Sequence, residues 1–442
     1  MEFMERQLMH ELIQWKNNPL RKPLLLKGAR QVGKTRLLEE FGRREFKTTA
    51  VVNCEKTPSA KELFEQDFDV SRILRGISAL TGMEMIPGKT LIILDEIQEV
   101  PRALQALKYF CEDARSYHIC AAGSLLGIKM RGEYSFPVGK INELTLYPMN
   151  FMEFVRARRG DVMCRALEKD PPEEISTLSD QWIELLRQYY FTGGMPEAVY
   201  SFIKHENLNE VREIQRQILQ DYDDDISKHA DTNTVLRIHQ IWPSIAQQLA
   251  RENKKFVYGH IRKGARAREY EIALQWLSDA GLVYKVSRIK KAGIPLKFYE
   301  ETDAFKLYYL DCGLMGALSE VPSRQILIGS SIFQEYKGAF TEQYVLQQLM
   351  SLCPGGIYYF HPENSQQEVD FLTQDEDKIY AIEVKAEENL KAKSLKLFHE
   401  QYPEAVSVRF SMAGYRKQDW LTCYPLYLIS RLFDSTGVVE KN

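Results

Sequence analysis

Glycines and a lysine–threonine pair with the spacing of a phosphate-binding loop stand near the start of the sequence. The run Gly28-Ala-Arg-Gln-Val-Gly-Lys-Thr35 matches the pattern GxxxxGK[ST] in full. Glycine lets the backbone wind so tightly that its N–H groups converge on phosphate oxygens. The pattern predicts that Lys34 bridges the β- and γ-phosphates of ATP and that the Thr35 hydroxyl binds Mg²⁺. The predicted nucleotide-binding residues of the loop are Gly28, Arg30, Gln31, Val32, Gly33, Lys34 and Thr35.

An acidic pair follows a second apolar run about sixty residues later. In Leu91-Ile-Ile-Leu-Asp95-Glu96, four apolar residues predict a buried strand that ends in two carboxylates. We expect Asp95 to hold the Mg²⁺ shell and Glu96 to polarise an attacking water. The alternative is that the pair caps the following helix. Ser124 ends a later strand, where it either senses the γ-phosphate or caps a helix.

The C-terminal third carries another set of acidic and basic residues. Asp370 and the Glu383–Lys385 pair lie on two predicted strands, and Glu342 lies on a predicted helix over 340–350. Residues two apart on a strand share a face, so Glu383 and Lys385 point together and Asp370 can meet them. Glu342, Asp370 and Glu383 could bind Mg²⁺, while Lys385 activates a water for phosphodiester attack. The alternative is a surface Glu–Lys pair on an edge strand.

The elements that must position these residues are predicted from apolar periodicity. Strand-like runs that alternate with helical stretches indicate a parallel α/β sheet; they lie at 23–26, 51–53, 90–95 and 119–122. Helices dominate 156–232, and helices followed by a hairpin at 281–286 and 296–299 occupy 233–325. A second α/β unit is expected from 326, with strands at 356–360, 368–372, 379–385 and 406–410.

Length and composition limit the class of protein. At roughly 100–200 residues per domain, 442 residues predict several domains, which we place at 1–155, 156–232, 233–325 and 326–442. With 44% hydrophobic and 27% charged residues, disorder is excluded. No apolar run approaches the roughly 18–20 residues of a membrane span, and the N-terminus lacks the pattern of a secretory signal. Seven scattered cysteines without CxxC spacing indicate reduced thiols and a cytoplasmic location.

Residues 251–300 are basic in a chain whose net charge is -3. They hold twelve Lys and Arg against five Asp and Glu. The segment has helices first, then the glycine at 281 and then a basic hairpin. This is the order of elements in a winged helix, in which Lys and Arg contact DNA phosphates. The alternative is a packing module between the two ends of the chain.

A set of motifs occurs in a fixed order along the chain, and together they indicate a specific protein family. These are Gly28–Thr35, Leu94-Asp-Glu-Ile-Gln98, Ala122-Gly-Ser124, Phe136-Pro-Val-Gly-Lys140, Leu146-Tyr-Pro148 with Glu153-Phe154, and Gly193-Gly-Met-Pro-Glu-Ala198. Together they resemble a prokaryotic family of AAA+-type ATPases related to the STAND and archaeal-ATPase clade. The resemblance implies a P-loop NTPase sheet, a helical lid that includes 193–198, a winged-helix segment and a C-terminal α/β domain like a restriction endonuclease.

Within that resemblance, Glu342, Asp370, Glu383 and Lys385 correspond to a PD-(D/E)xK nuclease site. Val369 stands where the nuclease pattern has proline. An arginine finger is not assigned: Arg131 is a candidate on position alone, and the alternative is a solvated charge.

The leading interpretation is a Mg²⁺-dependent ATPase that couples ATP hydrolysis to a nuclease-like module acting on DNA. Its expected partners are ATP and ADP, with DNA contact through 251–300 and the C-terminal domain as a further hypothesis. No membrane partner is expected, and an oligomer is compatible with the resemblance. One alternative is a nucleotide-controlled regulatory protein whose nuclease-like domain only binds DNA or protein. Another is a scaffold in which ATP is structural.

Overall fold

The computed structural model describes residues 3–124, 136–251, 254–328, 334–353, 355–363, 365–386 and 393–436. The chain divides into two compact units. The N-terminal unit comprises Met1–Tyr147 with Asp279–Gly281, and the C-terminal unit comprises Pro148–Ser278 with Leu282–Asn442. Within the described ranges, no helix combines the length and the apolar character needed to cross a membrane. All seven cysteines are free thiols.

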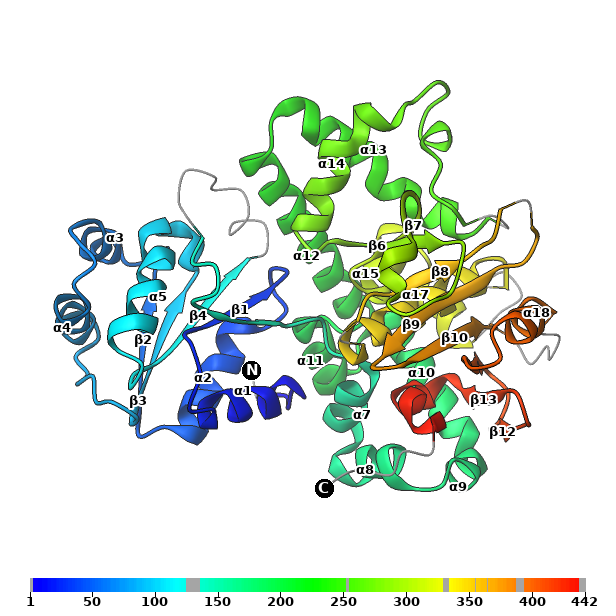
Figure 1. Ribbon diagram of the computed structural model, residues 1–442, viewed down its shortest axis with the longest axis horizontal. Coiled ribbons are helices and arrows are strands. Elements are labelled where there is room, and N and C mark those ends of the chain that lie inside the picture. Colours follow the sequence, from blue (N-terminus) through cyan, green and yellow to red (C-terminus); the bar gives the residue numbers. More distant parts are fainter. Residues whose placement is uncertain are drawn as a thin grey trace. The chain divides into compact units, whose positions relative to one another are not determined.

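The N-terminal unit is a three-layer α/β arrangement (Figure 1). Its elements are α1 (Leu8–Asn17), β1 (Leu24–Gly28), α2 (Lys34–Glu45), β2 (Thr48–Asn53), α3 (Pro58–Glu65), α4 (Val70–Thr81), β3 (Thr90–Asp95), η1 (Ile97–Glu99), α5 (Pro101–Asp113), β4 (His118–Ser124) and β5 (Asn142–Thr145). The strand order is β2-β3-β4-β1-β5, and the four pairings are parallel. The predicted parallel α/β sheet is confirmed.

Helices cover both faces of this sheet because its strands are apolar on both. Leu25, Ile92 and Ile119 face one layer and join a core with α3, α4 and α5. Their neighbours Leu26 and Ile93 are equally buried, and alternation directs them to the face of α1 and α2. The carboxyl ends of β3, β4 and β1 therefore meet at one edge.

The C-terminal unit begins with helices, as expected for 156–232. Its helices are α7 (Phe151–Arg159), α8 (Asp161–Lys169), α9 (Pro172–Ile175), η2 (Ser176–Leu178), α10 (Ser179–Thr192), α11 (Pro196–His205), α12 (Leu208–His229), α13 (Thr232–Leu249), η3 (Tyr258–His260), α14 (Ala267–Asp279), η4 (Leu296–Tyr299), α15 (Cys312–Leu318), α16 (Ser323–Ile328), α17 (Gln334–Leu352), α18 (Lys393–Gln401) and η6 (Leu426–Thr436).

The glycine pair at 193–194 has a tertiary reason. Gly193 ends α10 with a φ of 71°, and a Cβ there would lie 2.0 Å from Asp311 Oδ1. The amide of Gly194 donates to Asp311 Oδ2 at 2.6 Å. Only glycine allows this buried carboxylate to approach the turn between α10 and α11 so closely.

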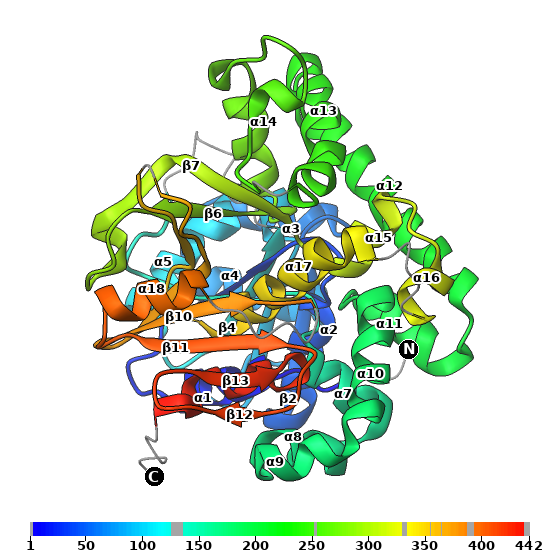
Figure 2. The ribbon, with the colours of Figure 1, turned by 90° about the vertical axis from the view of Figure 1, so that its right-hand side faces the viewer.

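One mixed sheet contains every described strand of this unit. The strands are β6 (Val283–Ile289), β7 (Glu300–Tyr309), β8 (Tyr358–Phe360), β9 (Val369–Asp375), β10 (Lys378–Val384), β11 (Val406–Ser411), β12 (Arg416–Lys417) and β13 (Thr422–Pro425). Their order is β12-β13-β11-β10-β9-β8-β6-β7. Figure 2 shows β10, β11 and β13 side by side, and both α17 and α18 pack against the sheet.

The predicted hairpin at 281–299 forms with a later second strand. β6 and β7 pair antiparallel, but 296–299 is the 3₁₀ helix η4 and β7 begins at Glu300. Pro295 fixes φ and offers no N–H to a ladder. The amide of Leu296 donates to the Gln374 side chain at 2.6 Å, so a tertiary contact replaces the strand pairing there.

The hairpin also joins strands from beyond residue 325. β6 pairs in parallel with β8, placing Ser287 beside Tyr358. The described part of 233–325 therefore has no separate sheet of its own, and the predicted boundary at 325 does not divide two sheets. The apolar pattern of the sequence predicted the strand β6, but it did not indicate that β6 would pair with β8.

Candidate nucleotide site and C-terminal charged cluster

The loop between β1 and α2 has the tight winding that its glycines predict. Gln31 and Gly33 have φ values of 65° and 93°, and α2 begins directly afterwards at Lys34. A Cβ on Gly28 would lie 2.4 Å from the carbonyl oxygen of Leu146, so the first glycine is sterically required. The loop thus presents backbone amides and a helix N-terminus at one point, where an anion is stabilised.

Lys34 lies against the loop that it follows. Its Nζ donates to the carbonyl oxygens of Gly28 and Ala29 at 3.1 and 2.8 Å. Burial lowers the pKa of this ammonium to about 8, although Glu96 and Asp95 oppose the shift. A buried cation with carbonyl partners at the mouth of an anion-binding loop is well placed to exchange those partners for phosphate oxygens.

Thr35 and Asp95 meet directly, although sixty residues separate them. The Thr35 hydroxyl donates to Asp95 Oδ1 at 2.8 Å, and Asn53 Nδ2 donates to Asp95 Oδ2 at 3.1 Å. Burial raises the pKa of Asp95. A hydroxyl and a carboxylate are the hard oxygen donors that Mg²⁺ takes together with phosphate and water, so the residues present fit that ion.

Glu96 has a fixed orientation next to this pair. Its φ of 49° turns the chain sharply after β3, and Gln98 Nε2 donates to its Oε2 at 2.5 Å. The amide of Ser124 donates to Gln98 Oε1 at 3.4 Å. Because Ser124 is also the register partner of Gly28, this chain of contacts connects Glu96 to the strands flanking the loop.

Two further residues of the site were not predicted from the sequence. Arg6 is buried and donates to the carbonyl oxygens of Val32 and Tyr147 at 2.9 and 2.6 Å. Asn53, which orients Asp95, is its register partner on β2. Neither belongs to a spacing pattern; the only available signal for Asn53 was its place at the end of an apolar strand.

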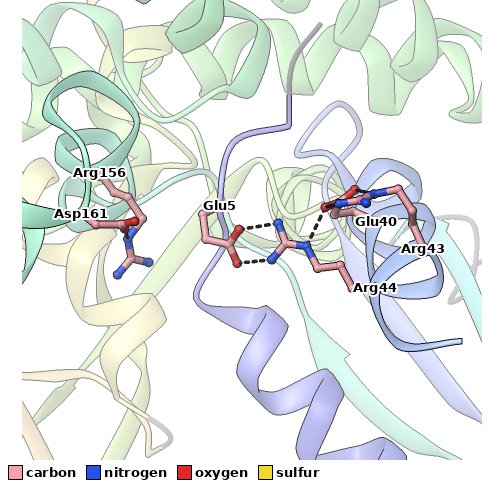
Figure 3. Close-up of polar contacts among 6 residues, drawn as sticks. All are labelled: Glu5, Glu40, Arg43, Arg44, Arg156 and Asp161. Carbon is pink, nitrogen blue, oxygen red and sulfur yellow. Dashed lines mark hydrogen bonds and ion pairs between the residues drawn. The ribbon is translucent and has the colours of Figure 1, made fainter.

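The neighbour of Arg6 ties the same N-terminal segment to α2. The Glu5 carboxylate accepts hydrogen bonds from both terminal nitrogens of Arg44, at 2.9 and 2.7 Å. Arg44 Nε donates to the Glu40 carboxylate at 2.6 Å (Figure 3). Arg43 also pairs with Glu40 at 2.6 Å. The segment before α1 is therefore fixed to the helix that begins at the loop. Arg131, the arginine-finger candidate, lies outside the described residues.

The C-terminal acidic residues lie in a charged cluster that we define as Lys254, Lys306, Glu342, Glu368 and Asp370. Lys254 contacts Glu342 Oε1, and Tyr308 donates to Glu342 Oε2 at 3.2 Å. Lys306 is fully buried and donates to Glu368 at 2.6 Å. Burial, with the Glu342 carboxylate nearby, raises the pKa of Asp370 to about 6. The sequence predicted Glu342 and Asp370 but not the two lysines.

Glu383 and Lys385 are close together, as strand alternation predicts. Lys385 Nζ lies 3.4 Å from Glu383 Oε1, and Arg409 Nε donates to Glu383 Oε2 at 2.9 Å. Arg409 is almost entirely buried on β11, the strand next to β10. Both carboxylate oxygens of Glu383 therefore have a cationic partner.

The described residues contain no group of three or more His, Cys, Asp or Glu side chains arranged to hold a metal ion. The three acids have partners within the chain: Glu342 and Glu383 contact cations, and Asp370 Oδ2 accepts the Val384 amide at 2.8 Å. The metal-binding and catalytic roles of Glu342, Asp370, Glu383 and Lys385 stay predictions.

Four exposed basic side chains of 251–300 lie just before and at the start of α14. Arg262, Lys263, Arg266 and Arg268 are all exposed. Arg262 pairs with Glu269 at 3.2 Å. In the hairpin region, Arg288 and Lys290 pair with Glu301, whereas Lys285, Lys291 and Lys297 are exposed. Exposed positive charge therefore lies both on residues 262–268 and along the hairpin region.

Family models cover most of the chain in three parts. Residues 20–155 match an AAA domain. Residues 183–325 match a domain of unknown function (DUF8612), and residues 337–429 match another (DUF4143). A search among curated proteins found no match to this chain.

Solved structures with similar folds are distant. A Walker-type ATPase of Pyrococcus abyssi is 16% identical over 72% of this chain and 96% of its own, with a TM-score of 0.46. The Aeropyrum pernix ORC1 protein in complex with DNA is 15% identical over 73% and 92%, at 0.27. C. elegans PCH-2 is 13% identical over 36% and 45%, at 0.23.

The family match coincides with the geometry of the N-terminal unit. The matched residues 20–155 include the β1–α2 loop, the Thr35–Asp95 contact and Glu96. A parallel sheet whose carboxyl edge carries these groups is a nucleotide-binding architecture. This part of the chain is a P-loop ATPase-like domain of the AAA type.

Proposed function

We propose that the protein hydrolyses ATP at the carboxyl edge of the N-terminal sheet. The observation that carries this proposal is the 2.8 Å hydrogen bond between Thr35 and Asp95 beside a fully formed phosphate-binding loop. Mg²⁺, when bound, supplies charge neutralisation for the phosphate oxygens, and Thr35 and Asp95 are the residues that would hold it. Arg30, Gln31, Val32 and Gly33 offer their backbone amides to the phosphates.

The remaining groups have distinct tasks in this proposal. Lys34 leaves the carbonyls of Gly28 and Ala29 and binds the terminal phosphates, where its charge stabilises the transition state. Glu96 accepts a hydrogen bond from the attacking water and orients it in line with the γ-phosphate. Gln98 positions Glu96, and the Ser124 side chain lies at the neighbouring strand end to contact the γ-phosphate.

Phosphate release with Mg²⁺ and ATP tests this directly. Lys34→Ala is expected to lower kcat/KM at least 100-fold, because it removes a buried cation from the phosphates. Lys27→Ala is a matched control, since Lys27 is on β1 but only pairs with Glu143 at 2.9 Å near the surface. Equal turnover in wild type and Lys34→Ala would refute the proposal.

We further propose that ATP turnover controls a C-terminal unit that binds DNA or protein without cutting it. The observation that favours binding over cleavage is that the carboxylates of Glu342 and Glu383 already have cationic partners. Arg262, Lys263, Arg266 and Arg268 are the exposed cations that would contact phosphates. In this proposal the protein acts in the cytoplasm.

Cleavage assays distinguish this from the nuclease hypothesis. We expect no cutting of plasmid or single-stranded DNA with Mg²⁺ or Mn²⁺, with or without ATP. Cleavage that disappears in Lys385→Ala would instead assign the PD-(D/E)xK roles of Asp370, Glu383 and Lys385.

Charge reversal at Lys263 and Arg266 is expected to weaken DNA binding at least tenfold if the basic segment is the contact surface.

A further inference from the structure

We infer that Lys254 occupies the cation position of the C-terminal charged cluster, so that the folded protein needs no divalent ion there. Glu342 is the central acid of this cluster, with a side chain only 3% exposed. Lys254 contacts one of its oxygens, and Tyr308 donates to the other at 3.2 Å. Lys254 thus already supplies a positive charge at Oε1, which a metal ion would have to displace in order to bind there.

The surrounding charges support the same assignment. Asp370 lies within electrostatic reach of Glu342, Lys254 and Lys306. Lys306, with no exposed surface, pairs with Glu368 at 2.6 Å. A divalent ion inserted among these carboxylates would face two ammonium groups in a buried setting, where like charges repel strongly. The chain's own lysines thus compensate the acids that a metal would otherwise neutralise.

Lys254 and Lys306 differ in how firmly the fold fixes them. Lys306 is in the middle of β7, so its position follows from strand pairing. Lys254 instead lies between α13 and α14, and its side chain is 21% exposed. Lys254 is therefore at the open side of the cluster, and its removal would leave Glu342 and Asp370 with one cation fewer. This converts the cluster into a carboxylate site for a hard divalent ion.

Manganese binding to the full-length protein without nucleotide tests the inference. We would count bound Mn²⁺ by electron paramagnetic resonance in wild type, Glu342→Gln, Lys254→Met and the double variant. Wild type and Glu342→Gln should bind the same number of ions, because the cluster takes none. Lys254→Met should bind one additional ion, and Lys254→Met/Glu342→Gln should lose it. Any Mn²⁺ bound at Thr35 and Asp95 is present in every variant, so it cancels when the ion counts of two variants are subtracted.

The control is Lys396→Met, which removes an exposed lysine on α18 of the same unit and should bind as many Mn²⁺ ions as wild type does. Thermal melts establish that each variant is folded. Loss of one ion on Glu342→Gln in the wild-type background would overturn the inference, since the cluster would then bind metal beside Lys254. A folded Lys254→Met that gains no ion would overturn it equally. Neither result depends on ATP hydrolysis.

Discussion

At the scale of single residues, the nucleotide site depends on amide side chains as well as on its charged groups. Gln98 bridges Glu96 and the Ser124 amide, and Asn53 holds the oxygen of Asp95 that Thr35 does not contact. An amide can donate and accept at once, so it can orient a carboxylate without neutralising it. These residues determine where the carboxylates point.

Replacing Gln98 separates the orientation of the Glu96 carboxylate from the binding of ATP. Gln98→Leu should lower kcat for ATP about tenfold, because Glu96 loses the donor that fixes its carboxylate, a loss of roughly 1.4 kcal/mol in transition-state stabilisation. The Kd for ATP should change less than twofold, since Gln98 lies outside the phosphate loop. Steady-state turnover and fluorescent-nucleotide titration measure the two quantities. Gln105→Leu, on α5, is the control.

Much of this site follows from the sequence and part of it does not. The spacing of Gly28, Lys34 and Thr35 implies their proximity because one loop connects them, and Asp95 follows from the apolar strand before it. Arg6 and Asn53 are recognisable only once the fold brings them to the site, because an isolated arginine or asparagine matches many surface roles. The same limit applies to Lys254 and Lys306 beside Glu342.

At the scale of elements, the segment before α1 contacts the loop and the helix of the candidate nucleotide site. Arg6 binds the carbonyl of Val32, and Glu5 binds Arg44 on α2, so one short segment holds both the loop and the helix that follows it. This segment restricts the conformations of the loop before a ligand arrives. Preorganisation of this kind contributes to affinity.

Removal of the Arg6 side chain should therefore weaken nucleotide binding. Arg6→Met should raise the Kd for ATP about fivefold and destabilise the protein by roughly 1–3 kcal/mol, because one buried and one partly buried carbonyl lose a charged donor. Isothermal titration and denaturant unfolding measure both effects. Arg43→Met is the control, because its exposed pair with Glu40 contributes little. An unchanged Kd in Arg6→Met would show that the segment is not part of the site.

The packing of β4 against α1 predicts acid sensitivity. His118 lies edge-on to Trp15 and Phe46, with ring centroids 5.8 and 5.0 Å away. Burial, and then the Arg21 charge, lower the pKa of His118 to about 4. The unfolded chain binds this proton near pH 6.5, so the unfolded state takes up more protons between pH 6.5 and 4. Stability must fall as the pH decreases through that window.

Substitution of His118 should reduce this dependence. Between pH 7 and pH 5, wild type should lose about 2 kcal/mol of unfolding free energy more than His118→Gln does. Urea unfolding at the two pH values measures the difference. His10→Gln, at an exposed position on α1, should keep the wild-type dependence. A His118→Gln variant with unchanged pH dependence would contradict the assignment.

Element prediction was accurate for isolated strands and weaker for their partners. The runs that became β3, β10 and β11 were predicted within two residues, because β3 is a nearly continuous apolar segment and β11 alternates apolar and polar residues. The segment 296–299 was predicted as a strand, but the Leu296 amide binds Gln374 instead. The apolar periodicity of a sequence indicates which face of a strand is buried. It contains no information on which other strand will pair with it.

At the scale of the whole molecule, the chain combines two units with different sheets. The N-terminal sheet is parallel and bears the candidate nucleotide site, whereas the C-terminal sheet is mixed and includes the β6–β7 hairpin. Pairing of β6 with β8 connects residues before and after 325 in one sheet. We therefore expect the strands from β6 to β13 to unfold together, across the boundary that the sequence pattern predicted at 325.

Nucleotide binding should stabilise the N-terminal unit selectively if the units unfold separately. A ligand at 100 times its Kd adds about 2.7 kcal/mol, which for a unit of this size raises Tm by roughly 5–10 °C. Calorimetry with and without Mg²⁺ and ATP should show one transition moving and another nearly fixed. Lys34→Ala should abolish the shift. A wild-type protein in which no transition moves would contradict nucleotide binding.

The most direct test of ATP hydrolysis at this edge is the Glu96→Gln variant, which keeps the shape of the side chain and removes its charge. Bound ATP and its hydrolysis would be followed in a single turnover with Mg²⁺. The variant should bind ATP with nearly wild-type affinity and hydrolyse it at least 100 times more slowly, because the water loses its acceptor while Lys34, Thr35 and Asp95 remain. Hydrolysis at the wild-type rate in Glu96→Gln would contradict the catalytic assignment.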